Sequence, residues 1–133
     1  LSLSLSLFSL PLFPPHASPS KSHSVQVAAT HTDFDCVYLV GGHGCCVDFA
    51  GEQAVALVAV VNAQYAAGKL VAADCHGPYG LIDCTKADGT PLVAGLEVTA
   101  FSDSEEKAAG AMEWVLGNAV SMEQKFTEQG ESF

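Results

Sequence analysis

Two short apolar runs separated by a long alanine-rich segment dominate the middle of the chain. The first run is CVYLV at residues 36–40, and the second is LVAA at residues 70–73. Continuous apolar runs of this length are typical of strands that are buried on both faces of a parallel sheet. Residues 52–67, between the two runs, contain no proline and are followed by Gly68, which predicts a helix with a glycine stop.

The order strand, helix, strand predicts a βαβ unit with parallel strands. In an open α/β sheet, ligands bind beyond the carboxyl ends of the strands. The turn GGHG at residues 41–44 follows the first expected strand, and the turn DCHGP at residues 74–78 follows the second. We therefore expect these two turns to meet at one edge of the sheet.

The second half of the chain predicts shorter elements. A short helix is expected to continue through residues 80–83, and residues 92–93 and 97–100 are expected as two short strands. Two later helices are predicted from their N-cap signals. Ser102 precedes several acidic residues, and Ser121 precedes a glutamine three positions later.

Residues 1–32 differ in composition from the rest of the chain, because they are rich in leucine and serine and contain no acidic residue. A transit peptide, a secretory signal and translated sequence outside the domain are the interpretations left open. We predict a low-complexity leader over residues 1–32, disordered or transit-like, and one partial domain over residues 33–133. The expected location is cytoplasmic, with the plastid as the alternative if the leader is a transit peptide.

The charge of the chain narrows the classes of partner. It has 15 acidic residues against five lysines, no arginine, and a formal net charge of −10. Nucleic-acid binding needs a basic face, and so does binding to anionic membrane surfaces. No apolar run approaches the ~20 residues of a membrane span. We therefore expect a small neutral or weakly polar substrate, no nucleic acid and no membrane.

The cysteines predict free thiols. There are five, an odd number, and no CxxC pair occurs: Cys36, Cys45, Cys46, Cys75 and Cys84. This spacing fits neither a small disulfide scaffold nor a cysteine-based zinc site. The prediction is a reducing compartment, no metal and no cofactor.

Cys75 stands where the second apolar run turns into the next helix. A cysteine on a sharp strand-to-helix turn is lifted above the sheet, and the N–H groups of the helix start favour its thiolate, the nucleophilic form. The adjacent His76 can serve Cys75 only if the turn is strained or the imidazole folds back. An acid that orients His76 has to come from elsewhere in the chain.

Together these segments resemble a known family. FDCVYLVGGHGCCVDFAGEQAVALVAVVNAQYAAGKLVAADCHGPYGLID resembles the centre of the ThiJ/PfpI (DJ-one) superfamily. DGTPLVAGLEVTAFSDSEEKA is similar chiefly to its glyoxalase III (D-lactate dehydratase) branch. The specific signal is GGHG, AxxCHGP and VTxFSxxEE in that order. The resemblance implies an α/β fold, a flavodoxin-like three-layer sandwich with a parallel sheet, incomplete in this chain.

By position, the resemblance implies three catalytic residues. Cys75 resembles the nucleophile of the family, and His76 resembles its imidazole partner. Glu106 resembles the acid that orients the histidine, and Glu105 is the alternative if the register slips by one. The family also has an early glutamate that binds the nucleophile, but no Glu precedes Glu52 here.

The glycine turn resembles the substrate-binding loop of the family. Gly42 and the backbone N–H of His76 resemble the donors of an oxyanion hole. His43 and Gly44 belong to the same substrate-binding group, although His43 either lines the pocket or only caps the turn.

The implied function is glyoxalase III-like conversion of methylglyoxal to D-lactate without glutathione, or a related deglycase activity. Such a protein is a lyase if the missing segments are supplied, and its partner is a small 2-oxoaldehyde. Two alternatives stay open: a stress-responsive chaperone or redox sensor that uses Cys75 oxidation, and an inactive fragment. A homodimer is expected, because unpaired strands expose apolar surface.

Overall fold

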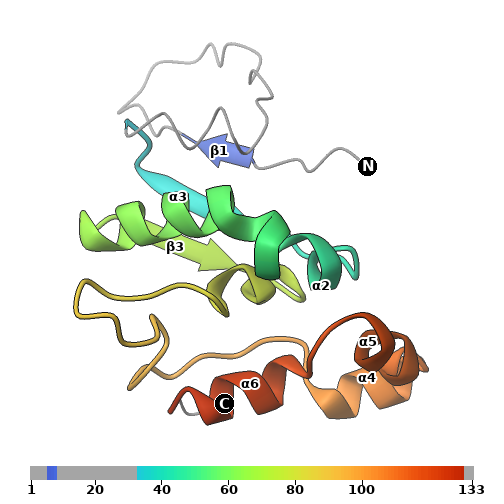
Figure 1. Ribbon diagram of the computed structural model, residues 1–133. Coiled ribbons are helices and arrows are strands. Elements are labelled where there is room, and N and C mark those ends of the chain that lie inside the picture. The colour runs from blue at the N-terminus through green and yellow to red at the C-terminus, as the bar shows by residue number, and fades with distance from the viewer. Residues whose placement is uncertain (1–5, 9–32, 131–133) are drawn as a thin grey trace.

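The computed structural model describes residues 6–8 and 33–130 of the chain (Figure 1). Its sheet has the order β1-β2-β3, with β1 at Ser6–Phe8, β2 at Cys36–Leu39 and β3 at Leu70–Ala73. Strands β2 and β3 pair in parallel, and β1 pairs antiparallel with β2. The predicted parallel pair is confirmed. Strand β1 belongs to the expected leader, whose other residues lie outside the described ranges.

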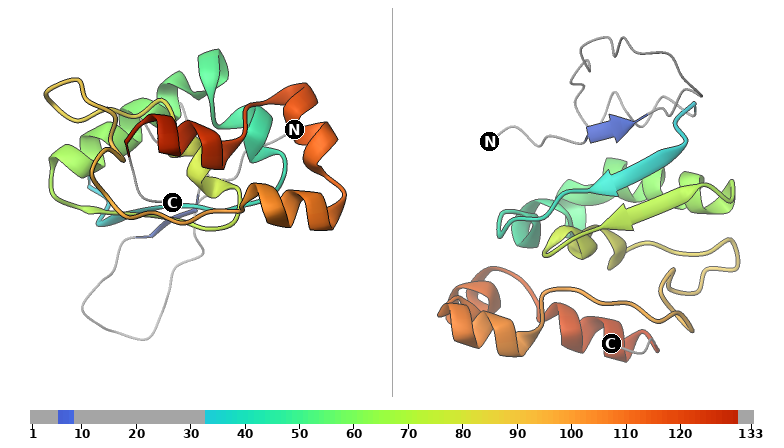
Figure 2. Two further views of the ribbon diagram at one scale, coloured as in Figure 1. Left: turned by 90° about the horizontal axis from the view of Figure 1, so that it is seen from below. Right: turned by 180° about the vertical axis from the view of Figure 1, so that it is seen from behind.

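The connection between β2 and β3 is helical. It consists of α2 (Cys45–Asp48), the 3₁₀ turn η1 (Gly51–Ala54) and α3 (Val55–Ala66). The expected central helix is confirmed, although its first turn is 3₁₀. Figures 1 and 2 show α3 lying across one face of β2 and β3. The α/β class is therefore confirmed.

The core fills the space between the sheet, α3 and the C-terminal half. It contains the inward side chains Val37 and Leu39 of β2 and Val61 of α3, all fully buried. Tyr79 and Phe126 contribute the largest aromatic side chains that are buried in it. Burial of such side chains is the main source of stability for a domain of this size.

The C-terminal half consists of short helices joined by turns. They are η2 (Gly77–Leu81), α4 (Asp103–Ala109), α5 (Met112–Asn118) and α6 (Met122–Glu128). Both predicted N-caps are confirmed, since Ser102 accepts a hydrogen bond from the Glu105 N–H and Ser121 accepts one from the Gln124 N–H. Gly110, with a φ of 72°, ends α4.

The two short strands expected at residues 92–93 and 97–100 are not formed. The N–H of Leu96 bonds to the carbonyl of Val93, and that of Leu92 bonds to the carbonyl of Cys84. The first segment is therefore a turn, and residues 98–100 have no ladder partner among the described residues. None of the helices in the described ranges is long and apolar enough to cross a membrane.

The turns after β2 and β3 lie against each other. The Gly41 N–H donates to Asp74 Oδ1 at 2.9 Å, and the Asp74 N–H donates to the Leu39 carbonyl at 3.3 Å. A Cβ atom at Gly41 would lie 2.7 Å from the Cβ of Cys75, so only glycine permits this approach. The prediction that the two turns meet at one sheet edge is confirmed.

Candidate active site

Cys75 occupies a strained turn between β3 and η2. Its φ of 52° is left-handed, a conformation that costs a residue with a Cβ roughly 1–2 kcal/mol. The residue is exposed, and its Sγ lies 3.1 Å from Nδ1 of His76. The strain thus brings together two adjacent side chains that would diverge on an ordinary turn.

His76 is fully buried and held on several sides. Its ring stacks on Phe101, with ring centroids 4.7 Å apart, and lies parallel to Tyr79 at 6.3 Å. Its Nε2 lies 2.5 Å from Oε1 of Glu106. A carboxylate only accepts hydrogen bonds, so we place the proton on Nε2, which leaves the Nδ1 lone pair facing the thiol of Cys75.

Glu106 projects from the first turn of α4 into the interior and is 2% exposed. Its neighbour Glu105 instead accepts hydrogen bonds from the backbone and hydroxyl of Ser102 and is exposed. Because the capping box fixes this turn, the two acids point in different directions. Glu106, and not Glu105, is the acid that lies beside His76.

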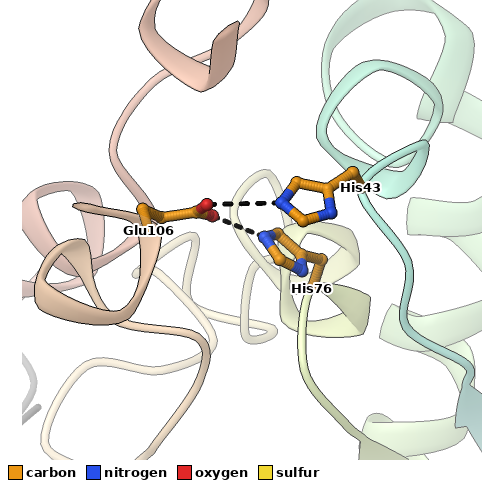
Figure 3. Close-up of side chains that lie close together, drawn as sticks. All are labelled: His43, His76 and Glu106. Atoms are coloured by element: carbon orange, nitrogen blue, oxygen red, sulfur yellow. Dashed lines mark hydrogen bonds and ion pairs between the residues drawn. The ribbon is translucent and has the colours of Figure 1, made fainter. Parts of the chain in front are cut away.

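The same carboxylate also contacts a second imidazole, which the sequence did not predict. Nε2 of His43 lies 3.3 Å from Oε2 of Glu106, and the rings of His43 and His76 are 4.2 Å apart (Figure 3). The side chain of His43 is 44% exposed. The family resemblance placed Glu106 beside His76, and the sequence pattern placed the GGHG turn at the same sheet edge, but neither predicted that His43 contacts Glu106.

The glycines of the first turn have different surroundings. Gly42 has a φ of 134°, and its carbonyl accepts a hydrogen bond from the Cys45 N–H. Gly44 is the N-cap of α2. Within residues 33–130, the N–H groups of Gly42 and His76 have no hydrogen-bond acceptor, which suits the predicted oxyanion role. The substrate-binding roles of the turn stay predictions.

Cys75 faces an open hollow of about 370 Å³. The hollow lies between the end of β3 and the segment before α4, and it is lined by Ala73, Asp74, Cys75, Thr99, Ala100, Phe101 and Glu105. The Phe101 N–H donates to the Cys75 carbonyl at 3.1 Å and so fastens the two walls together. A small molecule in this hollow would have direct access to the thiol.

Three other cysteines, Cys45, Cys46 and Cys84, are buried in the core, in contrast to Cys75. Burial raises the pKa of Cys84 to about 12, and burial together with the neighbouring Cys46 raises the pKa of Cys45 to about 11. Burial also raises the pKa of Cys46. These thiols are therefore protonated near neutral pH and act as packing residues.

The site also contains a potential set of metal ligands. One nitrogen each from His43 and His76 and one oxygen of Glu106 lie within 4.8 Å of one another. The sequence analysis predicted no metal site, because the cysteine spacing showed none of the usual patterns.

Comparisons with known proteins found a matching family model and several similar proteins. The model of the DJ-1/PfpI family matches residues 18–130. Over 81 residues the chain is 37% identical to the Saccharomyces cerevisiae glutathione-independent glyoxalase HSP31, which covers 59% of this chain and 32% of the yeast protein. It is 29% identical over 104 residues to Glyoxalase 3 of Candida albicans, which covers 76% of this chain and 43% of that protein.

Solved structures show the same fold. The Francisella tularensis Rapid Encystment Protein 24 KDa superposes with a TM-score of 0.67 at 31% identity, covering 76% of this chain and 44% of that chain. Another crystal structure superposes with a TM-score of 0.73 at 34% identity, covering 84% of this chain and 48% of its own. The expected flavodoxin-like fold with an incomplete sheet is confirmed.

The chain spans less than half the length of each of these relatives. The matched region nevertheless includes both turns and the start of α4, where Cys75, His76 and Glu106 lie. On the match over residues 18–130, the chain belongs to the DJ-1/PfpI family.

Proposed function

We propose that this chain provides the nucleophile, base and orienting acid of a glutathione-independent glyoxalase, which converts a 2-oxoaldehyde such as methylglyoxal into a 2-hydroxy acid, D-lactate. The observation that carries the proposal is the unbroken series of contacts from the Cys75 thiol through His76 to Glu106. The names of the curated relatives supply the substrate class.

The first step is addition of sulfur to the aldehyde. Nδ1 of His76 accepts the thiol proton of Cys75, and Sγ forms a bond to the aldehyde carbon. The carbonyl π bond breaks, and the resulting oxyanion accepts hydrogen bonds from the N–H groups of Gly42 and His76. Protonation of that oxygen gives a thiohemiacetal.

The second step moves a hydrogen between neighbouring carbons. The base removes the proton from the carbon bonded to sulfur, and an enediol forms as the adjacent ketone oxygen is protonated. Protonation of the second carbon, with loss of the hydroxyl proton on the carbon bonded to sulfur, then leaves a thioester of the 2-hydroxy acid. Water hydrolyses the thioester, which releases the acid and restores the thiol, so the net reaction adds one water to the 2-oxoaldehyde.

Glu106 has the role of holding His76 in the tautomer that accepts a proton at Nδ1. Without that carboxylate, the imidazole loses the partner that fixes its orientation in the buried pocket. The exposed hollow beside Cys75 is the proposed binding place of the aldehyde.

The direct test is to incubate the purified chain with methylglyoxal, without glutathione, and to assay D-lactate. We expect turnover by the wild-type chain and by Cys36→Ala, a control that removes a half-buried thiol of β2 far along the strand from the turn. Turnover is expected to vanish in Cys75→Ala. D-lactate formation that survives this substitution would remove the mechanism.

Oxidation of Cys75 supports a second candidate function, a redox sensor. An exposed thiol beside an imidazole is also the kind of sulfur that peroxide oxidises readily. Mass spectrometry after mild peroxide treatment tests this idea. Sulfinic acid confined to Cys75, in a chain that turns over no methylglyoxal, favours the sensor over the enzyme.

A further inference from the structure

The buried carboxylate of Glu106 has two imidazole partners, although the proposed chemistry uses only one. Its two oxygens are divided between them: Oε1 contacts Nε2 of His76, and Oε2 contacts Nε2 of His43. Figure 3 shows the three side chains converging from separate elements, with both Nε2 atoms directed at the carboxylate. Among the described residues, the imidazoles of His43 and His76 are the side chains that contact this carboxylate.

We propose that His43, His76 and Glu106 form a binding site for a divalent transition-metal ion of the zinc type, and that the bound ion switches off the thiol chemistry. The donors are two imidazole nitrogens and one carboxylate oxygen, a set that Zn²⁺ and Co²⁺ accept readily. The net charge of −10 over the chain favours binding of a cation.

The geometry needs little rearrangement to hold such an ion. Zinc–nitrogen bonds of about 2.0–2.1 Å in a tetrahedral site put neighbouring ligand atoms roughly 3.3 Å apart. The pair His43 Nε2 and Glu106 Oε2 already has this separation, at 3.3 Å. The distance between His76 Nε2 and Glu106 Oε1 is 2.5 Å and has to lengthen to roughly 3.3 Å.

The three proposed ligands differ in their exposure to solvent. His76 and Glu106 are buried and fixed, the first by stacking on Phe101 and the second by the first turn of α4. His43 is partly exposed, so its side chain offers an entrance from solvent. A buried pair with one partly exposed third ligand is a site that an ion can enter without unfolding of the chain.

The thiol of Cys75 lies outside the proposed ligand set. Its Sγ contacts Nδ1 of His76, on the opposite side of the imidazole ring from Nε2. Metal binding at this site is therefore expected to be independent of the cysteine, in contrast to adventitious capture of the ion by an exposed thiol.

The inhibitory effect follows from the tautomer of His76. An ion bonded to Nε2 takes the lone pair there, so the one remaining ring proton of the neutral imidazole is on Nδ1. Nδ1 then donates toward Cys75 and has no lone pair to accept the thiol proton. His76 therefore cannot bind the ion and act as a general base at the same time.

Binding is tested by titrating the chain with Zn²⁺ in a calorimeter and with Co²⁺ by visible absorption. We expect one saturable site in the wild-type chain and in Cys75→Ala, with the bands of nitrogen- and oxygen-ligated Co²⁺. We expect His43→Ala to lower the affinity at least tenfold. Glu105→Gln, an exposed acid next to Glu106, is the matched control and should bind like the wild type.

A second readout comes from Trp114, the single tryptophan of the chain, whose ring lies 6.0 Å from that of His43. Co²⁺ at the site should quench its fluorescence with the same midpoint as the absorption change. Circular dichroism confirms that each variant is folded. The proposal is overturned if the wild type shows no saturable binding, if His43→Ala binds the ion with undiminished affinity, or if binding is lost in Cys75→Ala.

The inhibitory part rests on the proposed glyoxalase function and has its own measurement. Zn²⁺ should suppress D-lactate formation over the concentration range in which it binds, and a chelator should restore it. In His43→Ala, whatever turnover is left should be insensitive to Zn²⁺ at that concentration. Binding without turnover contradicts the glyoxalase proposal alone, and turnover with undiminished rate in the Zn²⁺-saturated chain contradicts the switch alone.

Discussion

At the scale of single residues, the site rests on the backbone of Cys75. A left-handed φ at a residue with a Cβ is tolerated because the surrounding contacts impose it. The strain lifts the sulfur out of the turn and directs it at Nδ1 of His76. The position therefore combines lower stability with a thiol in reach of a base.

This strain predicts a gain in stability on substitution by glycine. Cys75→Gly should raise the free energy of unfolding by roughly 1 kcal/mol relative to Cys75→Ala, since glycine adopts the left-handed region without steric cost. Both variants lack the thiol, so their comparison isolates the backbone. Chemical denaturation measures the difference, and equal stabilities would mean that the turn stores no strain.

The different exposure of the cysteines predicts selective labelling. At pH 8, iodoacetamide should modify Cys75, which is exposed, and leave Cys45 and Cys84 unmodified. Burial raises the pKa values of these two to about 11 and about 12, so both stay protonated and hidden at that pH. Peptide mapping by mass spectrometry gives the extent at each site.

The control for the labelling experiment is the same reaction in denaturant, where all five thiols are expected to react. Modification of Cys84 as rapid as that of Cys75 in the native chain would contradict the buried position of the former.

At the scale of elements, the packing of η2 against β2 holds the turn in place. A Cβ atom at Gly77 would lie 2.0 Å from the carbonyl oxygen of Leu39. The first residue of η2 therefore has to be glycine for the helix start to approach the strand, and Cys75 and His76 are held between the two elements.

Gly77→Ala is therefore expected to destabilise the chain by roughly 2–3 kcal/mol, the upper range for overpacking of a core. Gly117→Ala in α5 is the matched control, because nothing lies within 4 Å of its added Cβ. That control should be neutral or slightly stabilising, as alanine is the better helix former. Thermal or chemical denaturation of the two variants checks the pair, and similar stabilities would contradict the tight contact.

The sequence predicted some of these strands and helices correctly and others incorrectly. Strands β2 and β3 and the helix between them follow from apolar runs and glycine stops. Cys75 and His76 are adjacent in the motif, but the strained turn, which the sequence left open, brings their side chains into contact. The expected strand at residues 97–100 did not form, because a short apolar run has the same pattern whether or not a partner strand lies beside it. Strand pairing is a tertiary property.

The same limit explains the acid and the second histidine. The sequence reduced the acid to Glu105 or Glu106, and the capping box at Ser102, itself readable from the sequence, decides which one turns inward. The contact of His43 with Glu106 depends on how α4 packs against the glycine turn. No local pattern encodes that packing.

At the scale of the whole molecule, the sheet has an open edge. Within the described residues, β3 pairs only with β2, and Leu70 on β3 is 61% exposed. Unpaired strand edges with apolar side chains favour association. The homodimer expected from the sequence stays a prediction, and so does the compartment.

We expect sedimentation to show a dimer of the wild-type chain, and Leu70→Lys to shift it toward monomer, because a charge on an edge strand opposes pairing. Lys69→Arg, which keeps the charge next to that position, is the conservative control. A wild-type chain that sediments as a monomer at all concentrations would contradict the prediction.

The proposed chemistry requires that one carboxylate, Glu106, directed inward by the first turn of α4, holds the base that activates Cys75. The most direct measurement is the rate of D-lactate formation from methylglyoxal by Glu106→Gln and Glu105→Gln side by side. We predict a loss of at least about 100-fold for Glu106→Gln and a loss of less than about tenfold for Glu105→Gln, whose side chain lines the hollow but is hydrogen-bonded to Ser102. Equal rates for the two variants, or the larger loss in Glu105→Gln, would contradict it.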